Sequence, residues 1–141
     1  MNDQSPANCD LNQAAVLFDQ AQEILDECFQ GRSIRKVLLV APPDIGFDLF
    51  DYDLTKRGRS NNYPPYGLIV LGRHLINHGL KVRICNLNHE ILKQCKGSNK
   101  ASDFDFLTTW KSKLAQDFEG FQPDLVGTTC LFTVTHPSLI Q

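Results

Sequence analysis

The sequence lacks the short motifs that would assign an enzyme class directly. It contains no GxGxxG, no GxxxxGK[ST], no GxSxG and no CxxxCxxC run that would hold an iron–sulfur cluster. No two of its five cysteines form a CxxC pair, and no Cys/His cluster has zinc spacing. We therefore expect reduced thiols, no iron–sulfur cluster in this chain and no catalysis by the chain alone.

Excess charge and long apolar runs are also missing. The 141 residues are 42% hydrophobic and 21% charged, with a net charge of -2. This balance gives no electrostatic basis for binding nucleic acid or a membrane surface, and no apolar run reaches the roughly 20 residues of a membrane span. Residues 1–10 lack the pattern of a signal peptide. We expect a cytoplasmic protein with neither a nucleic-acid nor a membrane partner.

The chain divides by pattern into two parts. In residues 1–33, a polar start that we expect to be disordered is followed by an amphipathic helix over 11–29, because apolar residues recur there every three or four positions. Gly31 is a plausible end for this helix. Residues 34–141 form the second part, and we expect the helix to pack alongside it.

Strands and helices alternate in the second part. We predict strands at 36–41, 81–86 and 125–130, separated by helices at 67–77 and 103–118. The apolar runs of the first and third strands indicate burial on both faces. A long polar loop follows the first strand, residues 87–100 form a connector with one short helical turn at 89–94, and another helix begins at 137.

This order predicts an α/β fold with a Rossmann-like (flavodoxin-like) parallel sheet, in strand order 2-1-3, with helices on both faces. The third strand is followed by so little chain that we expect the fold to be incomplete at its C-terminus. Its last strand would then be an exposed edge, made more apolar by Leu131, Phe132 and Val134. We therefore expect weak solubility or self-association through the third strand.

A sheet of this kind binds its ligand at the carboxyl ends of its strands. The third strand ends there in Thr128 and Thr129, whose hydroxyls can either bind a ligand or only cap the strand. His74 and His78 lie four apart on a helix, but no third metal ligand is evident, so we interpret them as surface or core residues. Trp110, at helical spacing from other apolar residues, is expected in the core.

Four segments carry a family resemblance by their order and spacing: VLLVAPP (37–43), YPPYGL (63–68), GLKVRI (79–84) and PDLVGTTC (123–130). Over roughly residues 35–141 the chain resembles the N-terminal cobalamin-binding domain of cobalamin-dependent radical S-adenosylmethionine enzymes. The resemblance implies a domain that holds cobalamin with its nucleotide tail between sheet and helices and its corrin over the strand ends.

The resemblance also implies which residues meet the cofactor. The loop after the first strand would lie under the corrin, and the pattern Thr129-Cys130-Leu131 would contact the buried tail. The implied cofactor-binding residues are Pro42, Pro43, Asp44, Tyr63, Pro65, Tyr66, Gly67, Thr128, Thr129 and Leu131.

This sequence departs from related patterns at several points. It has no Asp-x-His-x-x-Gly motif, so cobalt would bind without a histidine ligand. The second strand ends in Asn86-Leu87-Asn88, where many family members have an acidic residue. The later strands and the radical domain are missing, so we expect the chain alone to bind cobalamin weakly or not at all.

Three functions stay open from the sequence. The first is a cobalamin-binding module, the front part of a radical enzyme and non-catalytic by itself. The second is an interaction or remnant protein of the same fold that binds no cofactor. The third, a signalling receiver, needs an aspartate at the end of the third strand, where Cys130, Leu131 and Phe132 stand instead.

Overall fold

The computed structural model describes residues 11–129 of the chain, without the side chains of residues 11–15 and 18. Contacts divide the chain into two compact units, Met1–Ser33 and Ile34–Gln141. No helix within residues 11–129 combines the length and apolar character needed to cross a membrane. The helices and strands, in chain order, are α1 (Leu11–Phe29), β1 (Lys36–Ala41), η1 (Phe47–Leu49), α2 (Tyr52–Lys56), α3 (Tyr66–Asn77), β2 (Lys81–Asn86), α4 (Leu87–Gly97), η2 (Ala101–Asp103), α5 (Phe106–Phe121) and β3 (Leu125–Thr128).

The first unit contains α1, which covers the predicted range. The helix ends where Gln30 and Gly31 adopt left-handed backbone conformations, with φ of 47° and 71°. Glycine adopts this conformation without steric cost, which explains its place just beyond the helix. The predicted packing of this helix alongside the sheet stays a prediction.

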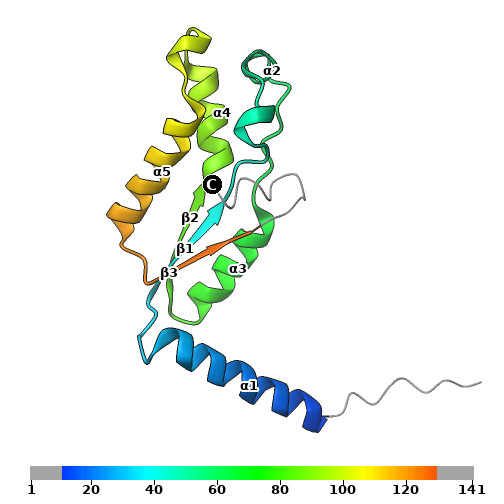
Figure 1. The fold of residues 1–141 in the computed structure, drawn as a ribbon, viewed down its shortest axis with the longest axis vertical. Helices are drawn as coiled ribbons and strands as arrows, with labels where there is room; N and C mark the ends of the chain where they lie inside the picture. Colours follow the sequence, from blue (N-terminus) through cyan, green and yellow to red (C-terminus); the bar gives the residue numbers. More distant parts are fainter. Residues whose placement is uncertain (1–10, 130–141) are drawn as a thin grey trace, which may run out of the picture. The chain divides into compact units, whose positions relative to one another are not determined.

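The second unit is an α/β domain built on a parallel sheet of order β2-β1-β3, as predicted (Figure 1). β1 lies in the middle because both of its faces are apolar, and all residues from Val37 to Ala41 are buried. Its register pairs Val37 with Val82 of β2 and with Leu125 of β3. The arrangement is Rossmann-like, as the alternation of strands and helices predicts.

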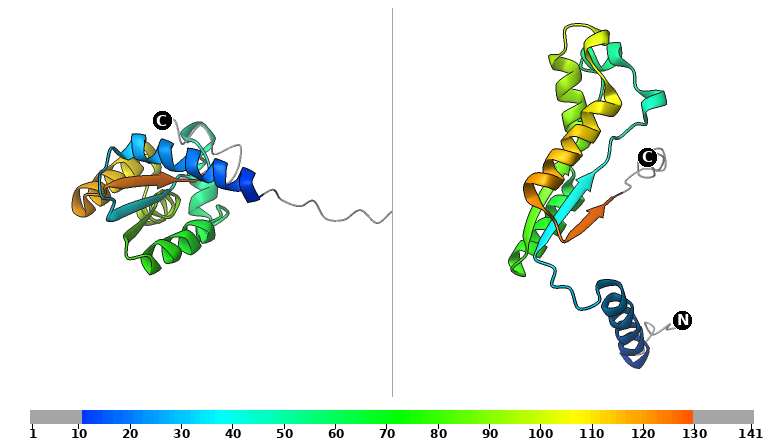
Figure 2. Two further views of the ribbon diagram at one scale, coloured as in Figure 1. Left: turned by 90° about the horizontal axis from the view of Figure 1, so that it is seen from below. Right: turned by 60° about the vertical axis from the view of Figure 1, so that its left-hand side comes forward.

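Helices cover both faces of this sheet (Figure 2). Val37, Leu39 and Ala41 of β1 pack with Leu68 of α3 on one face. On the other face, Leu38, Val40, Cys85 and Leu87 pack against Trp110, Leu114 and Phe121. The strand period of two residues therefore divides one apolar run between two cores, and the predicted core position of Trp110 is confirmed.

The region after β2 corrects the prediction of a connector with one short helical turn. A full helix, α4, begins at Leu87 with no intervening loop, because the Asn86 side chain accepts a hydrogen bond of 2.9 Å from the His89 backbone N–H. Its buried face consists of Leu87, Asn88, Ile91, Leu92 and Cys95. This spacing of three to four residues fixes α4 onto the domain.

The segment between β1 and α3 is also more ordered than a polar loop. It contains η1 and α2, and Asp51 caps α2 by accepting a 2.8 Å hydrogen bond from the Leu54 N–H. The Lys56 ammonium donates to the Lys96 carbonyl at 2.7 Å and to the Ser98 carbonyl, so it satisfies free carbonyls at the end of α4. Contacts with a distant helix therefore order this polar segment.

Two further predictions need correction. α5 begins at Phe106 rather than 103, because Asp105 accepts a 2.8 Å hydrogen bond from the Thr108 N–H. β3 spans only Leu125–Thr128 and is not buried on both faces, since Leu125 and Val126 are 36% and 46% exposed. The predicted residues of the strand beyond 129, and the helix from 137, lie outside the described residues.

A carboxylate just before β3 joins it to the start of β1. Asp124 accepts 2.8 Å hydrogen bonds from the backbone N–H groups of Arg35 and Lys36. These two donors lower the pKa of Asp124 below its ordinary value. Because the folded-state pKa is lowered, the stabilisation is present above the unfolded-state pKa and is lost as pH falls through the folded-state pKa.

We therefore expect Asp124→Asn to have a lower urea midpoint than the wild type at neutral pH. When the pH is lowered to about 3, the urea midpoint of the variant should fall by less than that of the wild type. Urea unfolding of both proteins at the two pH values checks this. Asp48→Asn, which removes an equal charge from an exposed position, is the control. If the urea midpoints of the Asp124 variant and the wild type fall equally on acidification, the Asp124 carboxylate does not stabilise the fold in this way.

Candidate functional site

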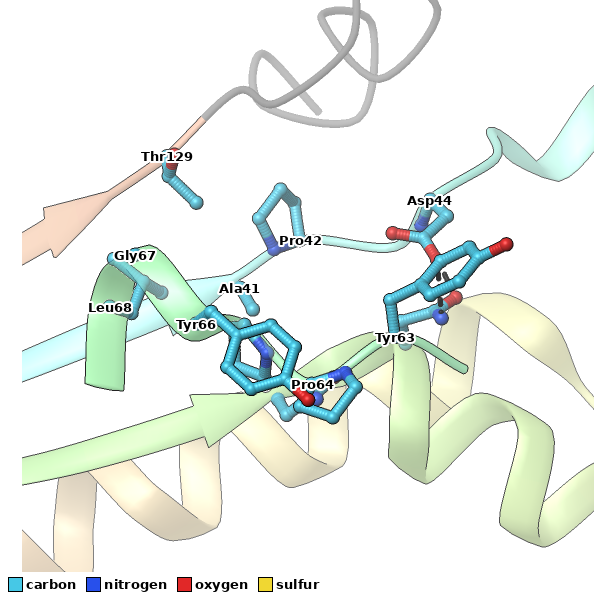
Figure 3. A pocket seen from close by; sticks show the side chains of 12 residues that line it. Ala41, Pro42, Asp44, Tyr63, Pro64, Tyr66, Gly67, Leu68 and Thr129 are labelled. Carbon is cyan, nitrogen blue, oxygen red and sulfur yellow. Dashed lines mark hydrogen bonds between the residues drawn. The ribbon is translucent and has the colours of Figure 1, made fainter. Parts of the chain in front are cut away.

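A cavity of about 460 Å³ opens at the carboxyl ends of the strands (Figure 3). Four segments line it: the end of β1 with the residues that follow, the Tyr63–Leu68 stretch that leads into α3, the junction of β2 with α4, and Thr129 just after β3. Its size falls within the range of about 300–1,000 Å³ typical of small-molecule sites. The lining residues are Ala41, Pro42, Asp44, Tyr63, Pro64, Pro65, Tyr66, Gly67, Leu68, Asn86, Asn88 and Thr129.

Prolines and tyrosines give the cavity apolar walls. Pro42 directly follows β1. Pro65 immediately precedes α3 and has a φ of -76°, a conformation that its ring favours. The side chains of Tyr63 and Tyr66 flank the opening and are 60% and 70% exposed. Their rings offer apolar surface at the mouth, and their hydroxyls reach solvent.

One buried amide fixes the polar end of the cavity. Asn88 is only 6% exposed. Its Oδ1 accepts a 3.2 Å hydrogen bond from the Asp44 backbone N–H, and its Nδ2 donates to Asp44 Oδ2 at 2.7 Å and to the Asn61 carbonyl at 3.4 Å. A single side chain of α4 therefore holds both the start and the end of the segment between β1 and α3.

The Asp44 carboxyl is perturbed by this environment. Burial raises the pKa of Asp44 above its ordinary value. The cavity therefore presents an acidic group in apolar surroundings.

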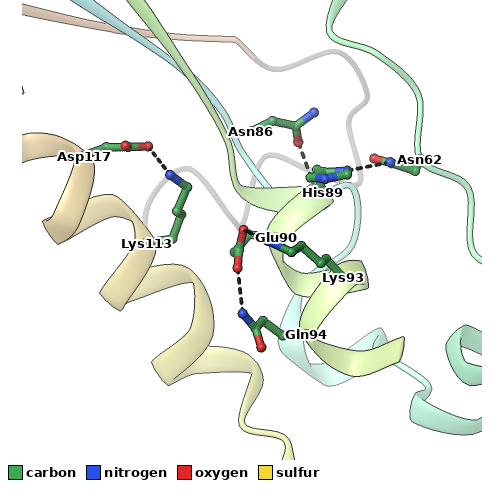
Figure 4. A network of polar contacts seen from close by, with 8 residues as sticks. All are labelled: Asn62, Asn86, His89, Glu90, Lys93, Gln94, Lys113 and Asp117. Carbon is green, nitrogen blue, oxygen red and sulfur yellow. Dashed lines mark hydrogen bonds and ion pairs between the residues drawn. The ribbon is translucent and has the colours of Figure 1, made fainter. Parts of the chain in front are cut away.

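A second contact holds the same segment at the first turn of α4 (Figure 4). The side-chain nitrogen of Asn62 lies 2.9 Å from Nδ1 of His89. His89 follows directly after Asn88, so adjacent α4 residues hold Asn61 and Asn62. This contact keeps the chain next to the Tyr63 wall of the cavity.

The structure brings together most of the residues that the resemblance implies at a cofactor. Pro42, Asp44, Tyr63, Pro65, Tyr66, Gly67 and Thr129 all line the cavity. Pro43 is buried but does not line it. Leu131 lies outside the described residues.

Thr128 and Thr129 point to opposite faces of the sheet, because side chains alternate along a strand. Gly127 of β3 faces Leu39 in the α3 core, so Thr129 shares that face and reaches the cavity. The hydroxyl of Thr128 instead donates a 3.2 Å hydrogen bond to the Val40 carbonyl. Thr128 therefore has the strand-capping role that the sequence left open.

Sequence reasoning did not assign Asn86 and Asn88 to the site. Asn86 is the last residue of β2 and Asn88 follows two positions later, at the end of the sheet where side chains gather around a ligand. Their position just after an apolar strand was the available signal. Their roles were not predicted because α4 was not predicted as a full helix. Asn86 caps this helix, and Asn88 is its first buried polar residue.

The described residues include no group of three His, Cys, Asp or Glu side chains suited to a metal ion. The rings of His74 and His78 lie 4.4 Å apart, and Nδ1 of His78 is 2.9 Å from the His74 carbonyl oxygen. Both side chains are exposed, His74 on α3 and His78 just after its end, so they are surface residues. The cavity lining within residues 11–129 contains neither histidine nor cysteine.

A second group of titratable side chains lies on the face of the sheet that α5 covers, opposite the face that α3 covers. Asp117 of α5 pairs with Lys113 at 2.8 Å (Figure 4). It also pairs with Arg83 of β2 at 3.7 Å. Burial acts to raise the pKa of Asp117, but hydrogen bonds from Lys113 and Cys85 outweigh it, so this pKa is lowered. Burial and Asp117 raise the pKa of Cys85 to about 12. The Cys85 thiol therefore stays protonated and belongs to the core.

Comparisons of the chain with models of protein families, with curated proteins and with solved structures give no match. The resemblance to cobalamin-binding domains therefore stays a prediction.

Proposed function

We propose that this chain is a cobalamin-binding module, the front part of a cobalamin-dependent radical S-adenosylmethionine enzyme, and that it is non-catalytic by itself in the cytoplasm. The observation that carries the proposal is the strand-end cavity, which seven of the ten residues implied by the resemblance line. These residues come from positions 42 to 129, so only the fold brings them together.

The chemistry of the lining suits part of a corrinoid. Apolar proline and tyrosine walls can bury the tail, while the Thr129 hydroxyl offers a hydrogen bond to it. The corrin ring is broader than the cavity and would lie at its mouth, against Tyr63 and Tyr66. Since the sequence has no Asp-x-His-x-x-Gly motif, we expect the cobalt to bind without a histidine ligand.

Of the two outcomes that the sequence leaves open, weak binding or none, the cavity favours weak binding. We expect a Kd of about 1 mM or slightly below, because much of the ligand would stay exposed. Titration followed by the cobalamin absorption spectrum measures this. Thr129→Val removes one hydrogen bond, at a cost of about 1 kcal/mol, so it should weaken binding about fivefold.

Thr128→Val is the matched control, because it makes the same change at the neighbouring residue whose hydroxyl bonds Val40. It should leave the affinity within about twofold of the wild type. Absence of a saturable spectral change at millimolar cobalamin would overturn the proposed function. A histidine-ligated spectrum would overturn the proposed mode of binding.

A second candidate, an interaction protein that binds no cofactor, is favoured by the exposure of β3. Val126 is 46% exposed on a strand that, within the described residues, pairs on one side only. Such an edge is a template for pairing with another chain, here a second copy.

If the edge acts in this way, the wild type should self-associate as its concentration rises, and Val126→Lys should reduce that association. Sedimentation velocity over a range of concentrations tests this. Val70→Lys, at a 69% exposed position on α3, is the control. A wild type that stays monomeric at the highest concentration would rule out this second candidate.

A further inference from the structure

Asp44 is the only acidic or basic side chain among the described residues that line the cavity. Every other lining residue is apolar, an amide, a hydroxyl or a glycine. A lone carboxylate in an apolar site strongly affects which ligand groups can enter, because an unpaired charge away from water is costly. The charge of this residue therefore dominates the selectivity of the cavity.

The carboxylate is fixed rather than free to turn away. Asn88, itself more than nine-tenths buried, donates to Asp44 Oδ2 at 2.7 Å and accepts from the Asp44 N–H at 3.2 Å. The second carboxylate oxygen, Oδ1, has no donor within hydrogen-bond distance among residues 11–129. Figure 3 shows this oxygen directed toward the Pro42 side of the cavity.

Because Asp44 Oδ1 is held in place, the ligand groups that it can bind are defined. It can receive a hydrogen bond from a carboxamide N–H or a hydroxyl, and it repels a carboxylate or phosphate placed at the same point. Among residues 11–129, the cavity lining supplies no Lys or Arg that would neutralise such an anion. The same oxygen therefore favours a carboxamide and disfavours a carboxylate or phosphate.

We propose that Asp44, positioned by Asn88, makes the cavity selective for ligands that present a carboxamide over ligands that present a carboxylate at the same place. This inference rests on the proposed function and names the part of a corrinoid that is read, namely its peripheral carboxamide groups. Asp44 is the specificity-determining residue and Asn88 is a positioning residue.

The selectivity can be measured with phenylacetamide and phenylacetate, which share size and shape and do not depend on cobalamin. Each is titrated into the full chain near neutral pH, and the backbone amide signals of Asp44, Gly67 and Asn88 are followed. We expect the amide to bind at least about tenfold more tightly than the acid. Asp44→Asn should reduce this preference to within about threefold, because an amide at this place can donate to a carboxylate.

Asp48→Asn is the matched control, since it removes the same charge from an exposed residue that does not line the cavity. It should keep the full preference. Equal binding of the two probes to the wild type, absence of binding by both, or an unchanged preference in Asp44→Asn would each overturn the inference.

A corrinoid pair separates this inference from the proposed function. Cobinamide carries peripheral carboxamides, whereas the corresponding corrinoid acid carries carboxylates. If cobalamin and both corrinoids bind without the preference, the inference fails and the proposed function stands. If no corrinoid binds but phenylacetamide is preferred over phenylacetate, the proposed function fails and the carboxamide selectivity of the cavity stands.

Discussion

Replacing Leu38 by alanine is expected to remove about 3 kcal/mol from the free energy of unfolding. Leu38 is fully buried at the middle of the central strand, where it packs with Val40, Cys85 and Leu87 against α5. A cavity at this point loses contacts with both the strands and the helix, and neither can collapse into it without disturbing the other. Since domains are stable by only about 5–15 kcal/mol, a sizeable unfolded population follows.

Urea unfolding monitored by circular dichroism measures this loss. Leu49→Ala is the matched control, because Leu49 is 68% exposed and should lose no more than about 0.5 kcal/mol. A loss below about 1 kcal/mol for Leu38→Ala would show that β1 is not the centre of a packed sheet.

Replacing Asn88 by alanine is expected to lower the free energy of unfolding by about 2 kcal/mol, because it leaves the Asp44 N–H and carboxylate without their partner. The loss should also free the segment between β1 and α3 and widen the cavity. Hydrogen exchange of the Asp44 amide should then become faster by more than tenfold, while exchange within β1 changes only in proportion to global stability.

Asn62→Ala provides the comparison for that variant. Asn62 lies on the same segment and contacts α4 through His89, but its side chain is exposed. Its removal should therefore cost well under 1 kcal/mol. If the two variants lose equal stability, the Asn88 amide does not have the anchoring role that its burial and three hydrogen bonds indicate.

The parts of the fold that the sequence predicts correctly are those dictated by local pattern. The continuous apolar run at 36–41 indicates a strand buried on both faces, and β1 is the central strand of the sheet. Pro64 and Pro65 mark the start of α3, which begins at Tyr66. In each case the side chains of the segment itself carry the information.

The parts that the sequence does not predict depend on contacts between distant residues. α4 was hidden because its cap, Asn86, is also the last residue of β2, so no loop separates strand from helix. α2 lies in a polar segment and contacts the end of α4 through Lys56. The sequence predicts the edge position of β3, but its apolar run also indicates burial on both faces, and Leu125 and Val126 are exposed instead.

The candidate site shows the same division. The rule that ligands bind at the ends of parallel strands directs attention to Thr128 and Thr129, and Thr129 lines the cavity. Choosing between Thr128 and Thr129 requires the strand register, because a shift of one residue exchanges the two faces. Asn88 could not be assigned because its partner, Asp44, lies 44 positions earlier in the chain.

The central claim is that the strand-end cavity binds cobalamin, and the most direct test is to map the backbone amide signals that move when cobalamin is added to the chain. Saturable shifts should be confined to the cavity, at residues such as Asp44, Gly67, Asn88 and Thr129. Gln94, Thr108 and Gln116, which line a separate polar hollow between α4 and α5, should not move. Shifts at that hollow alone, or no saturable shifts at millimolar cobalamin, would contradict the account.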